Sequence, residues 1–249
     1  MLSKSQLGFI KSLHQKKYRK ENEIFIVEGI KSIVEFINSP FKIHSIYYLA
    51  QYQSLLPALP ANIKLFEVNN AELDKISTLQ NPQGILALIH IPENKKLVAE
   101  DLKNKFTLVL DGVQDPGNLG TIIRTADWFG FNQIVCSLNT VEVFNSKTVQ
   151  ATMGSLARIK VSYEDLGAFL MGMDLPVFGA LLEGESMYRT DWGSEGLVIL
   201  GNEGQGISDE VKAFISNPVT IPRVGAAESL NVAISAAIIC SDISRNLQK

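Results

Sequence analysis

The 249-residue chain has two cysteines, three histidines and no apolar run long enough to cross a membrane. The cysteines, Cys136 and Cys240, are too few for a disulfide framework or a cysteine metal site. The first twenty residues lack the apolar block and cleavage site of a secretory signal. We therefore expect a protein of the reducing cytoplasm, with no membrane partner and no metal.

Acidic residues are absent from the first twenty positions, although the whole chain has a net charge of −3. Residues 1–105 carry a net charge of +4 and residues 106–249 a net charge of −7. A basic arm on an acidic body is typical of proteins that bind polyanions, and a solvated helix with scattered lysines explains the same residues equally well. The basic side chains of the arm are Lys4, Lys11, Lys16, Lys17, Arg19 and Lys20.

Alternating apolar patterns over residues 1–91 predict a small α/β domain. A helix is expected over residues 3–20, with Leu7, Ile10 and Leu13 on one face. Residues 92–105 are polar and are interpreted as a linker. Strands are expected at 24–27, 44–49, 64–68 and 84–90, and further helices at 28–38, 52–56 and 70–79.

Residues 106–249 alternate strands and helices, which indicates a mainly parallel sheet covered on both faces. In such sheets ligands bind beyond the carboxyl ends of the strands. The expected strands are 106–110, 133–137, 159–161, 177–182, 197–200 and 219–221; the helices are 119–129, 145–154, 164–170, 208–214 and 229–245.

The segment 106–131 contains an N-x-G-x-x-x-R pattern after its buried strand, made by Asn118, Gly120 and Arg124. We place Asn118 at the N-cap of the following helix and Arg124 about two turns on. A ligand above the sheet edge could then meet both side chains. A plain helix cap and a solvated arginine explain the pattern as well.

Two further loops in this half have unusual compositions. Residues 197–208 combine a buried strand with three glycines and Glu203, and glycines let a backbone approach a ligand closely. Residues 221–234 contain Ser229, interpreted as an N-cap, and Asn231, which lies in the first turn of an apolar helix. An ordinary glycine turn and a second capping group are the alternatives.

Taken together and in this order, the three segments resemble the motifs of the SpoU (TrmH) family of RNA ribose 2′-O-methyltransferases in the SPOUT superfamily. The residues that carry the resemblance are Asn118, Leu119, Gly120 and Arg124; Gly201, Asn202, Glu203, Gly204 and Gly206; and Ile221, Pro222, Gly225, Ser229, Leu230, Asn231 and Val232. Residues 25–29 and 82–87 also resemble the family's small substrate-binding domain, which has a ribosomal-protein-like α/β fold.

The resemblance implies S-adenosylmethionine as cofactor, ribosomal RNA as substrate, a homodimer built on the last helix, and a deep trefoil knot in the domain 106–249. It implies catalytic roles for Arg124, Asn118, Glu203, Asn231 and Ser229. It also implies cofactor contacts from Gly201, Ile221, Leu230, Leu200, Gly204 and Asn202. An arginine stays charged and is a poor base, so Arg124 is expected to grip a phosphate and stabilise a developing alkoxide. His14, His44 and His90 lie outside the motifs, which argues against a histidine base.

Three positions depart from the family pattern. Arg223 replaces an expected methionine, Ala233 a frequent serine, and Gln150 a common arginine. The last change bears on which RNA is modified. Transfer RNA as the substrate and a non-catalytic RNA-binding protein remain alternatives. A dinucleotide-dependent oxidoreductase is disfavoured because the glycines do not form G-x-G-x-x-G.

Overall fold

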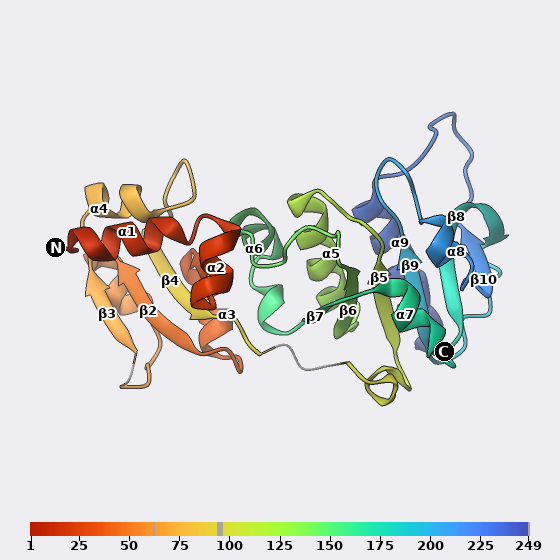
Figure 1. Ribbon diagram of the computed structural model, residues 1–249, viewed down its shortest axis with the longest axis horizontal. Coiled ribbons are helices and arrows are strands. Elements are labelled where there is room, and N and C mark those ends of the chain that lie inside the picture. Colours follow the sequence, from red (N-terminus) through yellow and green to blue (C-terminus); the bar gives the residue numbers. More distant parts are fainter. Residues whose placement is uncertain (62, 94–96, 249) are drawn as a thin grey trace. The chain divides into compact units, whose positions relative to one another are not determined.

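The computed structural model describes residues 1–61, 63–93 and 97–248, and its chain folds as two units (Figure 1). The N-terminal unit comprises residues 1–93 together with residues 142–157. The C-terminal unit comprises residues 94–141 and 158–249. The expected domain 106–249 is therefore interrupted by a segment that packs with the N-terminal unit. Residues 94–96 of the expected linker lie outside the described residues.

The N-terminal unit contains a four-stranded mixed sheet in the order β1-β4-β2-β3. β4 pairs antiparallel with both β1 and β2, and β3 pairs parallel with β2. The central strand β4 is almost entirely buried because it is apolar along its length. The strands are β1 (Ile24–Glu28), β2 (Ile43–Tyr48), β3 (Lys64–Glu67) and β4 (Ile85–His90).

The single helix expected over residues 3–20 is two helices, α1 (Lys4–Ser12) and α2 (Lys16–Asn22). Arg19 stabilises the break: its Nη1 donates to the carbonyl oxygens of Leu13 and His14, each at 2.9 Å. Its Nη2 pairs with Glu142 Oε2 at 2.6 Å, and the residue is only 3% exposed. One of the six basic side chains of the arm is therefore buried and paired, while the five lysines are exposed.

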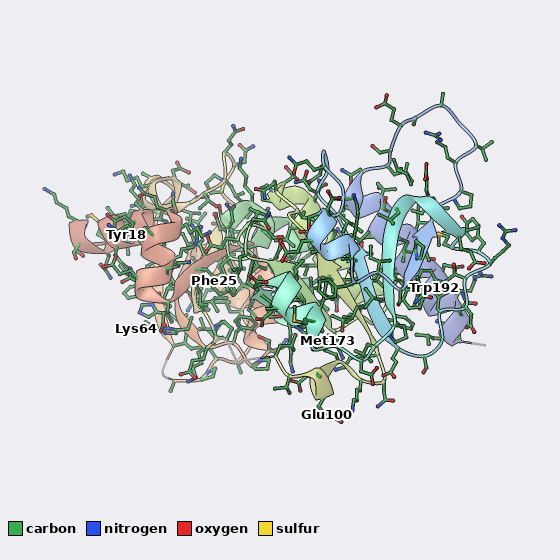
Figure 2. The ribbon with its side chains drawn as sticks, turned by 45° about the vertical axis from the view of Figure 1, so that its right-hand side comes forward. Tyr18, Phe25, Lys64, Glu100, Met173 and Trp192 are labelled. Carbon is green, nitrogen blue, oxygen red and sulfur yellow. The ribbon has the colours of Figure 1, made fainter. Side chains whose placement is uncertain are left out.

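The segment 142–157 supplies core side chains to the N-terminal unit. It forms α6 (Ser146–Thr152) and the 3₁₀ turn η3 (Ser155–Ala157). The ring of its Phe144 packs 4.7 Å from that of Phe25, which lies inside this unit (Figure 2). The unit also contains α3 (Ile30–Ile37), η1 (Ala50–Leu55) and α4 (Asn70–Ile76).

The C-terminal unit is built on a six-stranded, all-parallel sheet in the order β10-β8-β9-β5-β6-β7. The predicted parallel sheet is confirmed. The strands are β5 (Phe106–Leu110), β6 (Gln133–Ser137), β7 (Lys160–Glu164), β8 (Val177–Ser186), β9 (Gly196–Leu200) and β10 (Asn217–Thr220). β7 is longer than expected because only Ser162 of this edge strand is buried, so its polar end carries no apolar signal.

Helices α5 (Pro116–Trp128) and α9 (Val232–Leu247) pack against each other. A buried polar contact anchors α9: Trp192 Nε1, in the C-terminal unit (Figure 2), donates to Asp242 Oδ2 at 2.9 Å. The remaining elements are η2 (Ala99–Leu102), α7 (Leu166–Met171) and α8 (Asp209–Lys212). Within the described ranges, no helix has the length and apolar character that crossing a bilayer requires.

Candidate active site

The loops after β5 and β9 are tied together at the carboxyl edge of the parallel sheet. Asn202 Nδ2 donates to the carbonyl oxygen of Gly112 at 2.7 Å. The buried Asp111 accepts the backbone N–H of Ser208 at 2.7 Å through Oδ2. Because β5 and β9 are neighbours, both loops leave the sheet at one point, and these bonds hold them there.

The glycine-rich loop 201–208 is folded back on itself. The backbones of Asn202 and Gly206 exchange two hydrogen bonds, of 2.9 and 3.0 Å. Asn202 Oδ1 also accepts the N–H groups of Gly204 and Gln205. A Cβ atom on Gly201 would lie 2.2 Å from the backbone of Gly206, so this crossing requires glycine. The Asn202 side chain thus organises the loop.

Three side chains, one from each predicted motif, form a continuous hydrogen-bonded chain. Asn118 Nδ2 donates to Glu203 Oε1 at 2.9 Å, and Asn231 Nδ2 donates to Asn118 Oδ1 at 3.0 Å. A carboxylate can only accept, so the Asn118 amide nitrogen must face Glu203. Asn231 Oδ1 accepts N–H groups of its own helix, which turns its amide nitrogen to Asn118. Both amides are therefore held in one orientation.

Glu203 remains ionised because the donors around it outweigh its partial burial. Burial alone would raise the pKa of its carboxyl group, but hydrogen bonds lower it. The donors are the Asn118 amide and backbone N–H groups, including those of Gln114 and Asp115 at 3.3 Å. The net pKa lies below the ordinary glutamate value.

Both expected helix caps are shifted by a few residues. Asp115 is the N-cap of α5 and accepts the N–H of Asn118 at 2.8 Å, so Asn118 lies inside the first turn. Asn231, rather than Ser229, is the N-cap of α9. The placement of Asn118 and Ser229 at caps was wrong. Because Asp115 caps α5, both ends of the Asn118 amide are free to bridge the other motifs.

Arg124 and Ser229 are not part of this hydrogen-bonded chain. Both side chains are exposed, and neither forms a hydrogen bond or ion pair within the described part of the chain. Arg124 lies six positions after Asn118 in α5, which is a rise of about 9 Å along the helix. The guanidinium of Arg124 is thus available to an external anion.

The loop between β10 and α9 has few backbone hydrogen bonds; the carbonyl oxygen of Ala227 accepts Arg223 Nη1 at 3.2 Å. Residues 222–230 are all exposed and, among the described residues, form no backbone-to-backbone hydrogen bond. Leu230 is 50% exposed, and Ile221 is partly buried. By contrast, Leu200 is buried and its carbonyl oxygen accepts the N–H of Asp111. Free backbone groups beside apolar side chains suit a ligand with an adenine ring and a zwitterionic tail.

Several residues that support the site were not predicted. Gly112 N–H donates to Ser137 Oγ at 2.8 Å, and Ser137 Oγ lies 2.9 Å from Thr140 Oγ1, which fixes the turn after β5. The Asp115-Pro116 pair was also missed, although aspartate before proline is a standard signal for a helix start. No group of three metal-ligating side chains occurs within the described ranges.

Comparison with known proteins adds independent evidence. Residues 105–241 match the SpoU rRNA Methylase family, and residues 4–87 match the MRM3-like substrate binding domain. The chain is 34% identical to the 23S rRNA (guanosine(2553)-2′-O)-methyltransferase RlmP of Bacillus subtilis, over 92% of each protein.

Solved structures agree along nearly the whole chain. A Porphyromonas gingivalis protein assigned to the TrmH family of RNA methyltransferases superposes with a TM-score of 0.91 at 38% identity, covering 99% of both chains. An AdoMet-bound rRNA methyltransferase from Sinorhizobium meliloti superposes with a TM-score of 0.86 at 30% identity, covering 99% of this chain and 97% of that one. The resemblance seen in the three motifs is thereby confirmed. The chain belongs to the SpoU rRNA methylase family and carries an N-terminal MRM3-like substrate binding domain.

Proposed function

We propose that this protein transfers a methyl group from S-adenosylmethionine to the ribose 2′-hydroxyl of a guanosine in 23S ribosomal RNA. The observation that carries the proposal is the chain Glu203–Asn118–Asn231, which joins all three family motifs through hydrogen bonds of 2.9 and 3.0 Å. The guanosine and the 23S molecule are proposed from the full-length similarity to RlmP.

The cofactor is assigned to the loops after β9 and β10. Its residues are Leu200, Gly201, Asn202, Gly204, Ile221 and Leu230. Among the described residues, residues 222–230 form no backbone-to-backbone hydrogen bond, and the chain crosses itself tightly at Gly201. Both features support a cofactor site that is lined by backbone groups. S-adenosylmethionine supplies an already activated methyl group, so the chain's own task is to position the ribose and handle its proton.

Arg124 is assigned to the RNA phosphate next to the reacting ribose. Its exposed guanidinium has no partner in the described part of the chain, and a guanidinium binds phosphate through two parallel hydrogen bonds. The same positive charge stabilises the oxyanion that forms as the 2′-hydroxyl loses its proton. Asn118, Asn231 and Ser229 are assigned to orienting the ribose, and Glu203 to fixing the Asn118 amide.

A homodimer is proposed on the outer face of α9. An open hollow of about 720 Å³ lies there, lined by Phe129, Tyr188, Ile234 and Ile238 among others. Ile234 is 51% exposed and Trp128, near the end of α5, is 84% exposed. Exposed apolar patches of this kind mark protein interfaces. Light scattering of the wild type and of Ile238→Asp tests the dimer: a monomeric wild type contradicts it.

The trefoil knot and the division of labour between the units are also proposals. The knot would be made by residues 221–248 passing through the loop that follows β9. The contact of Asn231 with Asn118 and the packing of α9 on α5 support this path. Residues 1–91 are assigned to RNA binding, now together with the segment 142–157 that packs with them. We place the protein in the cytoplasm, where its ribosomal substrate is found.

Nucleoside mass spectrometry with nucleotide mapping tests this function in cells with and without the gene. The proposal requires one ribose-methylated guanosine of 23S rRNA to disappear with the gene. Loss of a methyl group from transfer RNA instead would move the substrate to that class. No change in any RNA would leave a non-catalytic RNA-binding protein.

A further inference from the structure

A second pocket, built wholly from the N-terminal unit, is not explained by methyl transfer. Its volume is about 330 Å³, which is within the range of small-ligand sites. It forms where the loop after β1, the start of α3 and helix α6 meet. The lining residues used below are Lys31, Ser32, Tyr52, Gln83 and Gln150.

Glycines shape the floor of this pocket and hold two of its side chains in place. Gly29 has φ +90°, and a Cβ there would lie 2.0 Å from Gln83 Oε1. Gly84 has φ +79°, and a Cβ there would lie 2.0 Å from the Tyr52 ring. The Gln83 amide therefore contacts the backbone of Gly29, and the Tyr52 ring contacts the backbone of Gly84. The Tyr52 ring is half-buried and packs against Gly84.

One end of the pocket is electropositive. Helix α3 starts there with Gly29 as N-cap, which offers no side chain, and no acidic residue occupies its first turn. The N–H groups of residues 30–32 find no acceptor in the described part of the chain. Such a helix start favours an anion. The preceding Glu28 does not serve as one, because Ser77 and Thr78 already bind its carboxylate.

The hydroxyl of a largely buried residue faces the same end of the pocket and provides an independent sign of a ligand. Ser32 lines the pocket and is only 6% exposed, yet its Oγ has no hydrogen-bond partner within the described ranges. The hydroxyl therefore reaches the pocket from an otherwise buried residue and can donate to a ligand there or accept from it. The exposed ammonium of Lys31 adds positive charge beside it.

The other walls suit a nucleobase. Tyr52 offers an aromatic ring, on which unpaired RNA bases commonly stack. Gln83 and Gln150 each carry both donors and an acceptor, as the edges of bases require. Because both amides are uncharged, this wall of the pocket can bind the edge of a base without adding charge.

We propose that this pocket binds one unpaired nucleotide of the RNA substrate, separate from the nucleotide that is methylated. The phosphate binds the start of α3, Ser32 and Lys31, and the base stacks on Tyr52 with its edge toward Gln83 and Gln150. The inference rests on the proposed function, because it assumes that RNA is the substrate. It gives the N-terminal unit a defined contact in place of general electrostatic attraction.

Steady-state methyl transfer by the full-length protein tests the pocket, with 23S rRNA from cells lacking the gene as substrate. Lys31→Gln and Tyr52→Leu should each raise KM for the rRNA roughly tenfold, the scale of one lost base stack or phosphate contact. The kcat at saturating rRNA and the cofactor Kd should not change. Lys42→Gln is the matched control, since it removes an exposed charge from the same unit outside the pocket. Melting curves check folding.

Each of the following results would overturn the proposal or the function on which it rests. Unchanged KM in both pocket variants, with an active wild type, refutes the pocket alone. An equal rise in the KM for rRNA in Lys42→Gln would show that the loss of net charge, and not the pocket, causes the rise. AMP binding at the α3 amide signals in NMR, with no dependence of rRNA KM on Tyr52, assigns the pocket to a free nucleotide. An inactive wild type instead refutes the proposed function itself.

If Tyr52→Leu does not fold, ultraviolet crosslinking of rRNA to the wild type decides: a crosslink at Tyr52 supports the pocket, and its absence contradicts it.

Discussion

Replacing Glu203 by glutamine tests whether the chain of amides at the active site depends on a carboxylate. Glu203→Gln keeps the shape of the side chain but makes one of its two terminal atoms a donor. Because Oε1 accepts Asn118 Nδ2 at 2.9 Å and Oε2 faces the N–H of Gln114 at 3.3 Å, one of these two contacts becomes donor against donor. The orientation of Asn118, and through it of Asn231, is then less strictly held.

The size of the loss in Glu203→Gln follows from the hydrogen bond between Asn118 and the charged carboxylate. A hydrogen bond to a charged group contributes about 1.5–3 kcal/mol, and the exposed position of Glu203 favours the lower end. A loss of about 1.5 kcal/mol from the positioning of the ribose is roughly a tenfold lower kcat. Folding should lose a similar amount, which lowers Tm by about 3–6 °C.

Single-turnover methyl transfer to saturating rRNA is the assay, measured beside a melting curve. Glu183→Gln is the matched control, because it removes an exposed carboxylate from the same unit. The lowered pKa of Glu203 means that its contribution is present above the unfolded value of about 4.3 and is lost only as pH falls through the lower folded value. The ratio of wild-type to variant rate should therefore be constant between pH 5 and 8. Equal rates for the wild type and Glu203→Gln would refute the reasoning. A ratio of wild-type to Glu203→Gln rate that falls between pH 8 and 6 would also refute it.

Three further perturbations separate the roles of the charged residues. Arg124→Lys should lower methyl transfer by about 10²-fold with unchanged cofactor Kd and Tm, because a lysine cannot bind phosphate through a planar pair of donors; a normal rate would remove its catalytic role. Glu142→Ala should lower the free energy of unfolding by about 3 kcal/mol in urea titrations, since it leaves the buried Arg19 unpaired; a loss below about 1 kcal/mol would contradict this. Reversing the charges of Lys16 and Lys17 should flatten the dependence of log K for RNA on log salt, and an unchanged slope would show that they make no phosphate contact.

The order of strands and helices was largely predictable from periodicity. Phe106–Leu110 is apolar except for Thr107 and is a buried central strand, and the helical spacing that follows it is α5. Cap positions were less predictable, because several residues near a helix start can accept its N–H groups. Asp115 and Asn118 compete in this way, and only the Asp115-Pro116 pair distinguishes them.

Contacts between distant segments could not be predicted from one sequence. Arg19 looks like a surface charge because its partner, Glu142, lies 123 residues away. Nothing in the sequence around Phe144 indicates that its ring packs against the ring of Phe25. The link from Asn231 to Asn118 spans 113 residues, so the motifs suggested that these residues act together but not which atoms bond. Tertiary packing determines each of these contacts.

The central claim is transfer of the methyl group to a ribose 2′-hydroxyl. Incubating the purified protein with deuterated-methyl S-adenosylmethionine and unmodified 23S rRNA, followed by digestion to nucleosides and mass spectrometry, tests it directly. We predict a single product, 2′-O-methylguanosine carrying the label, at one mapped nucleotide. Label on a base, or no label in rRNA with a folded, cofactor-binding protein, would contradict the claim.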